Sequence, residues 1–423
     1  MEQLLHYVWK HKIFPLKELQ TTTGLPLEII DPGLPNGNAG PDFFNAKIKI
    51  NGILWVGNVE IHTISSDWNQ HGHQYEKAYD SVILHVAEQT NCEVFRSNGE
   101  KIPQLQLPCP ESVRKHYDEL CQTEIIPSCY AILHTLPKLT IHSWLTALQT
   151  ERFEQKSKVI FERFKKHDSN WEDTFFITLA RNFGFGLNGD AFELWANRLS
   201  FRAMNKHRDN LMQIEAIFFG QAGLLGEESR DKYYLHLQKE YHYLQHKFDL
   251  QQTDVSLWRF SKLRPDNFPH VRIAQLAFLY HQKRALFSRI MESDTIISTK
   301  TILSIGTSYY WEEHYSFSKT SPRRTKSLGS SALDLILINT VVPFLYTYGL
   351  YRGDEHLCER ASTFLETLKA ENNYILRSWE GVGLSVRTAA DSQALLQLRK
   401  EYCDKKKCLF CRFGYEFLRD YTY

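Results

Sequence analysis

The stretch PDFFNAKIKINGILWVGNVEIH, residues 41–62, decides the fold of the N-terminal region. Asn51-Gly52 divides it into two runs rich in β-branched and aromatic residues, and this dipeptide between such runs is the strongest short-range signal for a β-hairpin. The sequence therefore predicts strands at 43–50 and 53–63. Because side chains alternate along a strand, the returning strand presents two sets of residues to opposite sides: Trp55, Val59 and Ile61 on one, and Asn58, Glu60 and His62 on the other.

The hairpin brings two carboxylates close together. With the turn at 51–52, residue 42 comes opposite residue 61, beside Glu60. Strict pairing would leave Asp42 on the face of Ile61, so a shared cation requires a bulge or an irregular strand start at Asp42. Two carboxylates held side by side repel each other unless a cation lies between them. We predict that Asp42, Glu60 and the carbonyl oxygen of Ile61 bind Mg²⁺ or Mn²⁺.

A histidine follows on the same face. His62 lies two residues beyond Glu60, where it can bind the metal, orient an attacking water or contact a phosphate. A hard cation, two carboxylates and an imidazole suit phosphodiester hydrolysis, so we assign the catalytic role to Asp42, Glu60 and His62. Four further polar residues follow: Asp67, His71, His73 and Asp80. In one interpretation they support the site or contact a phosphate. In the other, Asp67 caps a helix and the histidines lie on the surface.

Short helical and strand signals alternate around the hairpin. His85 lies in an apolar run that is typical of a buried central strand, and we predict a core histidine there rather than a ligand. Pro108–Pro110 marks the predicted boundary of this first region, residues 1–108. Its other predicted elements are a helix at 2–12, a strand at 25–30, a loop at 35–41, a helix at 67–79 begun by Asp67, a strand at 81–87, and a hairpin of 94–96 with 102–107.

Residues 109–423 are predicted to be mostly helical. The fold class is therefore α+β, with an N-terminal mixed sheet flanked by helices and a large helical region after it. Residues 319–331, rich in basic residues, Ser and Gly, are predicted to form a mobile loop. Helical periodicity recurs at 141–165, 172–182, 190–199, 208–221, 231–247, 269–290, 331–349, 355–370 and 391–402.

The composition is that of a soluble protein, and the length allows one large domain or, more naturally, two or three ordinary ones. Of 423 residues, 43% are hydrophobic and 23% charged, and the net charge is +1, so no overall basicity points to nucleic acid. The first 108 residues carry 8 Lys/Arg against 12 Asp/Glu, so a surface for a polyanion should come from the rest of the chain. Its candidate segments are residues 152–166 and 319–326, of which the second is the better.

The N-terminus lacks a signal-peptide pattern, and the longest apolar run, residues 333–350, contains Asp334, Asn339 and Pro343. We expect this run to be a buried helix, and no membrane partner. Eight cysteines in a chain of this length fit a reducing cytoplasm. We therefore predict a cytoplasmic protein.

Three cysteines near the C-terminus have the spacing of metal ligands. Cys403, Cys408 and Cys411 form Cys-x4-Cys-x2-Cys among basic residues, and three thiolates so spaced could hold zinc or part of an iron–sulfur cluster. A closed site requires a fourth ligand, for which Cys358 or His356 is the candidate. Reduced thiols at a helix end are the alternative. The remaining cysteines show no metal spacing and are interpreted as structural: Cys92, Cys109, Cys121 and Cys129.

These features resemble the PD-(D/E)XK nuclease superfamily. Pro41-Asp42 corresponds to its PD, and Glu60-Ile61-His62 to its E-x-K with histidine in place of lysine. The predicted order of helix, strand, hairpin, helix and strand is also similar. The resemblance implies a further first-helix ligand, Glu2 or His6, and in some members a cysteine-held iron–sulfur cluster near the chain end. The family's lysine is thought to position the attacking water, a role that the resemblance gives to His62.

Nearly the whole chain also resembles a bacterial family, domain of unknown function 2851. This resemblance implies no particular activity. The matching stretches are Gly40-Pro41-Asp42-Phe43, residues 57–62, Ser65-Ser66-Asp67-Trp68, residues 79–86, Asn267-Phe268-Pro269, residues 272–276, residues 391–394 and the cysteines at 403–411.

The sequence supports three hypotheses about function. The first is a Mg²⁺- or Mn²⁺-dependent nuclease that hydrolyses DNA or RNA, with substrate selection by the helical region. The second is a catalytically inactive nuclease-like module that binds nucleic acid or a protein. The third is a metal hydrolase of small phosphoesters that uses zinc or manganese and draws on Asp42, Glu60, His62, His71 and His73.

Overall fold

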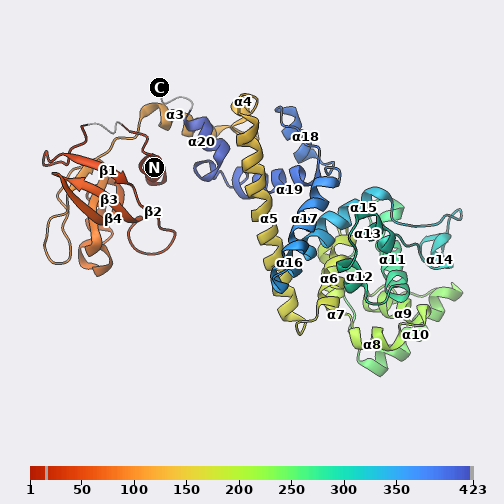
Figure 1. Ribbon diagram of the computed structural model, residues 1–423. Helices are drawn as coiled ribbons and strands as arrows, with labels where there is room; N and C mark the ends of the chain where they lie inside the picture. The colour runs from red at the N-terminus through yellow and green to blue at the C-terminus, as the bar shows by residue number, and fades with distance from the viewer. Residues whose placement is uncertain (15–17, 420–423) are drawn as a thin grey trace. The chain divides into compact units, whose positions relative to one another are not determined.

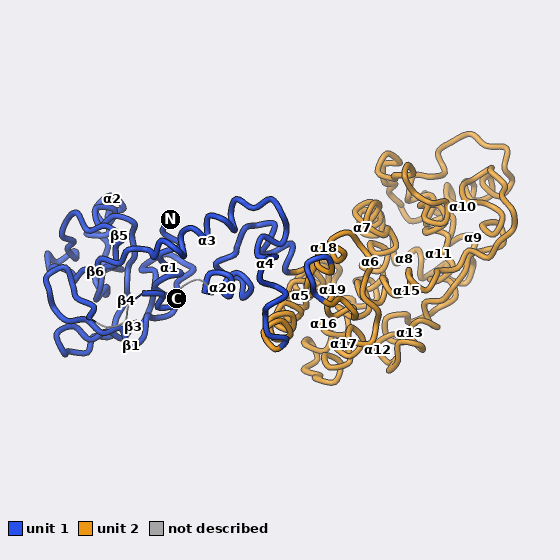
Figure 2. Tube along the Cα trace, turned by 90° about the horizontal axis from the view of Figure 1, so that it is seen from above, with its two compact units in different colours: residues 1–138, 381–384, 398–423 blue, residues 139–380, 385–397 orange. Residues whose placement is uncertain are grey.

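The computed structural model describes residues 1–14 and 18–419 and has an α+β fold, 56% helical. The chain divides into two compact units, coloured separately in Figure 2. Unit 1 comprises residues 1–138, 381–384 and 398–423, and unit 2 comprises residues 139–380 and 385–397. The predicted combination of an N-terminal mixed sheet with a large helical region is confirmed.

Unit 1 contains the mixed sheet. Its strands are β1 (Leu27–Asp31), β2 (Leu34–Pro35), β3 (Phe43–Ile50), β4 (Ile53–Ile64), β5 (Val82–Gln89) and β6 (Gln104–Gln106). They run in the order β1-β3-β4-β5-β6, with β2 beside β3. The predicted hairpin is confirmed, because β3 and β4 pair antiparallel across a turn in which Asn51 and Gly52 have φ values of 50° and 79°. β4 pairs parallel with β5, and β5 pairs parallel with β6. In Figure 1 the strands β1 to β4, coloured red to orange, lie together.

The N-terminal helix packs against this sheet. α1 (Glu2–Lys10) makes contacts with β4. It buries an apolar side that the sequence pattern predicts, formed by Leu4, Leu5, Val8 and Trp9. The Trp9 indole donates a hydrogen bond of 3.0 Å to the Pro32 carbonyl oxygen, so the otherwise buried ring has its N–H satisfied.

The predicted helix at 67–79 is wrong as a single element. The chain forms α2 (Asp67–Gln70) and two 3₁₀ turns, η1 (His73–Tyr75) and η2 (Lys77–Ser81). Gly72, between α2 and η1, has φ = 81°, a left-handed conformation that ends a helix and reverses the chain. Asp67 is the first residue inside α2 rather than its N-cap, which is Ser66. Trp68 and Tyr79 from this segment pack with three other buried residues: Val82, Val94 and Ile102.

Exposure changes along β4, and one further expectation for unit 1 is corrected. Trp55, predicted to point to the same side of β4 as Val59 and Ile61, is 43% exposed, whereas those two residues are buried. The reason is that β4 pairs with β5 only from Asn58 onward, so the first half of β4 lacks a neighbour on that edge. The predicted hairpin of 94–96 with 102–107 is reduced to one bridge, Phe95–Lys101, because β6 pairs with β5 instead.

Unit 2 is helical and encloses one extensive hydrophobic core. The predicted helix at 269–290 is interrupted at Ala285, whose φ is 50°. The helices of unit 2 are α5 (Lys138–Lys166), α6 (Trp171–Phe183), α7 (Gly189–Arg198), α8 (Phe201–His207), α9 (Leu211–Gln221), α10 (Lys232–Phe248), α11 (Pro269–Gln282), α12 (Leu286–Met291), α13 (Ile296–Leu303), α14 (Tyr309–Glu312), α15 (Ser330–Ile336), α16 (Val342–Arg352), α17 (Glu355–Thr367), α18 (Tyr374–Gly381) and α19 (Ala389–Leu398).

Helices α15 and α16 join through a π-helical turn into one stretch, residues 330–352. By length and composition this is the one helix among the described residues that would suffice to cross a membrane. In its most apolar window 67% of the residues are buried inside the protein, as in a core helix, which was the sequence expectation. The presence of this helix is therefore weak evidence that the chain crosses a membrane.

The basic segment at 319–326 is more ordered than predicted. It begins with β8 (Lys319–Thr320), which pairs with β7 (His314–Ser316). Lys326 is buried and donates to the carbonyl oxygens of Trp311 and Glu312. Arg323 pairs with the Glu312 carboxylate, and Arg324 pairs with Asp266. Much of the positive charge expected to meet a polyanion is therefore engaged within unit 2.

Candidate metal-binding site

A bulge in β3 places Asp42 beside Glu60. Ala46 pairs with Gly57, but Phe43 pairs with Val59, so β3 contains one residue more than β4 across this step. The extra residue brings Asp42 opposite Glu60 and not Ile61, which is the irregularity that the sequence argument required. Asn45 within the bulge has φ = 55°, a conformation that Asn tolerates better than most residues.

The two carboxylates are held by reciprocal hydrogen bonds. The Asp42 backbone N–H donates to Glu60 Oε2 at 3.0 Å, and the Ile61 N–H donates to Asp42 Oδ2 at 2.9 Å. Glu60 is buried, whereas the Asp42 side chain is 20% exposed. Burial raises the pKa of Glu60, and the Asp42 charge raises it further against the lowering effect of His73 and the Asp42 N–H. The repulsion would be relieved by a cation between the two groups.

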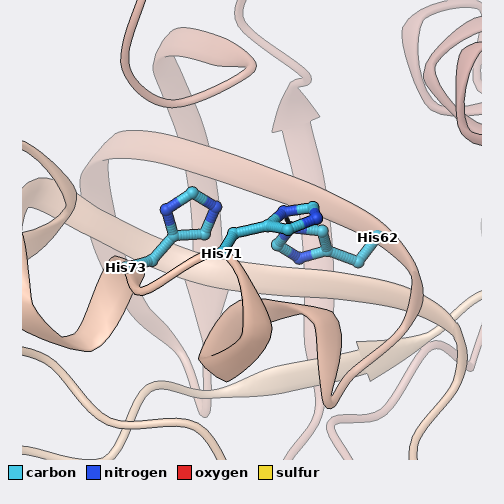
Figure 3. A group of neighbouring side chains, drawn as sticks. All are labelled: His62, His71 and His73. Atoms are coloured by element: carbon cyan, nitrogen blue, oxygen red, sulfur yellow. Dashed lines mark hydrogen bonds between the residues drawn. The ribbon is translucent and has the colours of Figure 1, made fainter.

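Three histidines gather next to Glu60, and we call them the histidine cluster: His62, His71 and His73. One ring nitrogen of each lies within 4.8 Å of the others, and Figure 3 shows the rings side by side, with His71 in front of His62 in that view. His62 comes from β4, whereas His71 and His73 flank Gly72, whose positive φ directs both toward the strand. Among the described residues, no other group of three or more His, Cys, Asp or Glu side chains has its ligand atoms this close together.

The cluster and Glu60 form one polar centre. Glu60 Oε1 lies 3.4 Å from His73 Nε2 and 3.7 Å from His62 Nε2. His62 and His73 are buried, whereas His71 is exposed to solvent. Burial, reinforced by the neighbouring histidines, lowers the pKa of His62 to about 3. His62 is therefore a neutral imidazole at physiological pH, the form that binds metals.

A chain of hydrogen bonds runs from the cluster into the sheet. His62 Nδ1 lies 2.9 Å from His85 Nε2, and His85 Nδ1 lies 3.2 Å from Gln104 Nε2. On the other side, His62 Nε2 lies 3.2 Å from His71 Nδ1. His85 is a fully buried core histidine, as predicted, and burial lowers its pKa to about 3. It also orients His62, a function that sequence reasoning missed.

The first helix contributes to the carboxylate side of the centre. His6 Nε2 lies 3.3 Å from Asp42 Oδ2 and 3.9 Å from Glu2 Oε1. Burial lowers the pKa of His6, but the charges of Asp42, Glu2 and Glu60 outweigh it, so that the pKa is raised overall. His6 thus reaches the carboxylate directly, and Glu2 reaches it through His6.

Other predicted residues have different tasks. Asp67 Oδ2 accepts from the Ile64 N–H at 3.3 Å, so it caps the end of β4. Asp80, predicted to support the site, instead accepts from the N–H and hydroxyl of Ser97 and fixes the loop there. The Ile61 N–H is engaged by Asp42, and the metal-ligand role predicted for its carbonyl oxygen stays a prediction.

Sequence reasoning could have found His85 and Gln104 from one signal. His85 is a polar residue inside the run predicted to be a buried strand, and Gln104 is a polar residue inside one strand of the predicted hairpin. His85 pairs with Glu60 on one side and with Gln104 on the other, so the three neighbouring strands carry polar residues at one level of the sheet. The missing information was the strand order, which no local pattern supplies.

The cysteines are arranged differently from the prediction. Burial and then the thiols of Cys411, Cys403 and Cys408 raise the pKa of Cys129, which was interpreted as structural, and the Cys121 thiol contributes in the same way to the raised pKa of Cys408. Cys358, predicted as the fourth ligand, lies in α17 of unit 2, where its thiol donates to the Tyr346 carbonyl oxygen at 3.6 Å. His356, the alternative, also lies in α17 and is almost fully exposed.

Fold and site together define an α+β protein whose N-terminal mixed sheet carries a buried cluster of histidines and carboxylates. The sequence profile of a family described as "Protein of unknown function (DUF2851)" matches residues 2–374. The chain therefore belongs to this family, and the match includes the whole candidate site. No curated protein and no solved structure matches the chain.

Proposed function

We propose that unit 1 is a metal-dependent phosphodiesterase that acts on nucleic acid and holds its metal with the histidine cluster and Glu60. The observation that carries this proposal is the convergence of three imidazole nitrogens within 4.8 Å of one another beside a buried carboxylate. Buried groups of this kind are paired or bind a metal, because each is costly to leave without a partner.

The side chains fit a divalent cation in three respects. His62 is neutral, so its ring nitrogen can donate a lone pair. The buried Nδ1 of His73 has no hydrogen-bond partner among the residues that the structure describes. Asp42 adds a second carboxylate next to Glu60, as in sites for divalent cations. The imidazoles favour Mn²⁺ or Zn²⁺ over Mg²⁺, which narrows the metal predicted from the carboxylates alone.

A bound cation would supply Lewis-acid stabilisation of the charge that develops on a phosphoryl group during hydrolysis. The chain's own residues do the rest. His62 and His73 would hold the metal from the buried side, and His71, which is exposed, would hold it from the side that substrate reaches. Asp42 is partly exposed and is backed by His6, so it is the group that accepts a proton from the attacking water.

Nucleic acid is the proposed substrate because of the order of the elements. α1, β1, the hairpin of β3 and β4, α2 and β5 follow one another as in the nuclease fold that the Pro41-Asp42 and Glu60-x-His62 pattern resembles. Histidine stands at position 62, where the nucleases have lysine, and His71 and His73 would supply two further metal ligands. A second candidate, a hydrolase of small phosphoesters, is favoured by the number of histidines, since such sites prefer zinc or manganese.

The test is metal binding and cleavage by the full-length protein. Protein freed of metal with a chelator is titrated with Mn²⁺, Zn²⁺ or Mg²⁺ and is then given single- or double-stranded DNA, RNA or bis(p-nitrophenyl) phosphate. We expect Glu60→Gln and His73→Ala to weaken metal binding strongly, and Asp42→Asn to weaken it less but to lower turnover by roughly a hundred-fold or more at saturating metal. Glu28→Gln and His236→Ala, at exposed positions, are the matched controls.

Four outcomes are distinct. Metal-dependent cleavage of polymers that is lost in the site variants but retained in the controls establishes the nuclease. Turnover of the small ester alone selects the second candidate. Metal binding without turnover of any substrate would show an inactive binding module, and the absence of metal binding by folded protein would refute the proposal.

A further inference from the structure

Three cysteines are brought together by tight turns at the end of the chain. Cys403 closes the π-helical turn η6 (Arg399–Cys403), Cys408 opens η7 (Cys408–Phe410), and Cys411 immediately precedes α20 (Arg412–Arg419). The Lys406 N–H donates to the Cys403 carbonyl oxygen at 3.1 Å, and the Cys411 N–H donates to that of Cys408 at 3.2 Å. Gly414 allows α20 to approach closely, because a Cβ there would lie 2.1 Å from the Cys408 carbonyl oxygen.

A fourth cysteine comes from a distant part of the sequence. Cys129 is buried just before α4 (Tyr130–Leu133), which packs against α20. Lys406 fastens the two segments, because its Nζ donates to the Thr123 carbonyl oxygen at 2.8 Å and lies 3.3 Å from the Ser128 hydroxyl. Ser128, the neighbour of Cys129 in the sequence, therefore lies beside the loop that carries the other three cysteines.

The thiols influence one another electrostatically. Burial raises the pKa of Cys129 well above its ordinary value, and the thiols of Cys411, Cys403 and Cys408 raise it further. Burial likewise raises the pKa of Cys408, to about 11, and Lys406 partly opposes this. Arg399 has the same opposing effect on Cys403. No disulfide links any two cysteines of this group.

We propose that Cys129 is the fourth ligand of a metal site that it forms with Cys403, Cys408 and Cys411. Four thiolates satisfy the closed coordination of a structural site, which the C-terminal triplet alone cannot provide. Metal binding displaces the four thiol protons, and the adjacent Lys406 and Arg399 offset part of the negative charge that results. Cys121, the other thiol near Cys408, is the rival for the fourth position.

The spacing favours an iron–sulfur cluster over one zinc ion. Among the described residues, no three cysteine sulfurs lie within 4.8 Å of one another. A single tetrahedral zinc with Zn–S bonds of about 2.3 Å needs sulfur atoms roughly 3.8 Å apart. A cluster of several irons is larger and takes thiolates that are further apart.

The site would fasten the C-terminal segment to unit 1. Residues 398–423 belong to this unit although almost all of unit 2 separates them from residue 138 in the sequence. A bond between Cys129 and the C-terminal triplet closes a very long loop, for which a covalent or metal link restrains the unfolded chain most strongly. The metal would therefore stabilise unit 1 without taking part in its chemistry.

The test is the metal content and absorption spectrum of the full-length protein purified without oxygen. We expect iron and acid-labile sulfide, with visible absorption that bleaches on reduction. Cys129→Ser should lose at least nine-tenths of the iron, as should Cys408→Ser, while Cys121→Ser and Cys358→Ser retain it. Alkylation of the unmodified protein provides a second measure that needs no variant: the four thiols should become reactive together when a chelator removes the metal.

Zinc in place of iron would support the four-thiolate site and overturn the assignment of a cluster. Full metal content in Cys129→Ser, or loss of metal in Cys121→Ser instead, would overturn the choice of the fourth ligand. Protein that is free of iron and zinc, with four thiols that react independently of one another, would overturn the site.

Discussion

At the scale of single residues, the position of one proton decides whether His62 can bind a metal. Gln104 Nε2 lies 3.2 Å from His85 Nδ1, and donation by the amide would place the His85 proton on Nε2, toward His62 Nδ1. The His62 proton then lies on Nε2, toward His71. Metal binding through Nε2 requires the reverse arrangement, in which His62 donates to His85 and His85 donates to the amide oxygen of Gln104.

Gln104 is therefore a positioning residue for the metal. Gln104→Leu removes the acceptor at the end of the chain, and we expect the dissociation constant for Mn²⁺ or Zn²⁺ to rise by about 10- to 100-fold. Gln104→Glu keeps an acceptor and should bind almost as tightly as the unmodified protein. Competition with a chromophoric chelator measures both constants. Equal affinity in the Leu and Glu variants, with both folded, would show that the chain of hydrogen bonds does not control the metal.

Glu215 in unit 2 gives a pH dependence of stability. It is fully buried in α9 and accepts hydrogen bonds from the hydroxyls of Tyr233 and Ser308. Burial raises its pKa from 4.5 to about 7, although these hydrogen bonds lower it. The folded protein therefore holds the proton more tightly than the unfolded chain, so that this contribution to stability is complete below pH 4.5 and is lost as the pH rises through 7.

The expected size of this loss is on the order of 3 kcal/mol in the free energy of unfolding, from the difference between the two pKa values. Urea unfolding at pH 5 and pH 8 measures it as the difference between the unmodified protein and Glu215→Gln. Glu366→Gln, an exposed residue of α17, is the control for the general effect of removing a carboxylate. If Glu215→Gln changes stability by the same amount at both pH values, Glu215 does not titrate in this range.

At the scale of elements, the bulge in β3 connects the hairpin to the site. Without the extra residue, Asp42 would face the side of Ile61 and would not meet Glu60. The bulge depends on Asn45, which has φ = 55° and whose N–H donates to Asn58 Oδ1 at 3.3 Å. A β-branched residue is strained in this left-handed conformation.

We therefore expect Asn45→Val to lower the free energy of unfolding by about 1–2 kcal/mol and to weaken metal binding, because Asp42 is displaced. Asn45→Gly should keep both properties, since glycine adopts positive φ without strain. Lys47→Val places the same side chain at an exposed position of β3 and should be tolerated. Unfolding curves and metal titrations of the three variants are compared. Equal stability of the two valine variants would argue against strain at the bulge.

The hairpin shows what the sequence could predict and what it could not. Asn51-Gly52 and the alternation of side chains are local signals, so they identify both strands and the shared face of Glu60 and His62. The bulge could be recognised only as a requirement, because the sequence does not mark its place. The contribution of His85 depends on the parallel pairing of β4 with β5, which is set by packing across the whole sheet.

At the scale of the whole molecule, the change in sequence texture near residue 108 identifies a sheet region followed by helices. The composition of unit 1 from three separate segments could not be predicted, because it depends on contacts between residues far apart in sequence. For the same reason the spacing of Cys403, Cys408 and Cys411 was visible, whereas Cys129 was not. The periodicity of each helix in unit 2 is local, and there the predicted segments correspond closely to the observed ones, as for α6 and α10.

The division into two units predicts where metal binding slows hydrogen exchange. Glu60 and His62 of the proposed site come from β4, His71 follows α2 directly, and His73 is the first residue of η1, all within unit 1. A metal present at 100 times its dissociation constant stabilises the bound form by about 2.7 kcal/mol, or roughly a hundred-fold in the exchange of amides that open with the site. Mn²⁺ should therefore protect peptides that cover residues 58–75 and 82–89, and leave α6 and α9 unchanged.

Mass spectrometry of the metal-free and metal-loaded full-length protein measures this exchange peptide by peptide, so unit 2 is the internal control. His73→Ala should abolish the protection, whereas His236→Ala, an exposed histidine of α10, should retain it. Protection that spreads evenly over both units would indicate nonspecific binding to surface carboxylates. Protection confined to residues around Cys129 and Cys403 would place the manganese at the thiols, in contradiction to the histidine site.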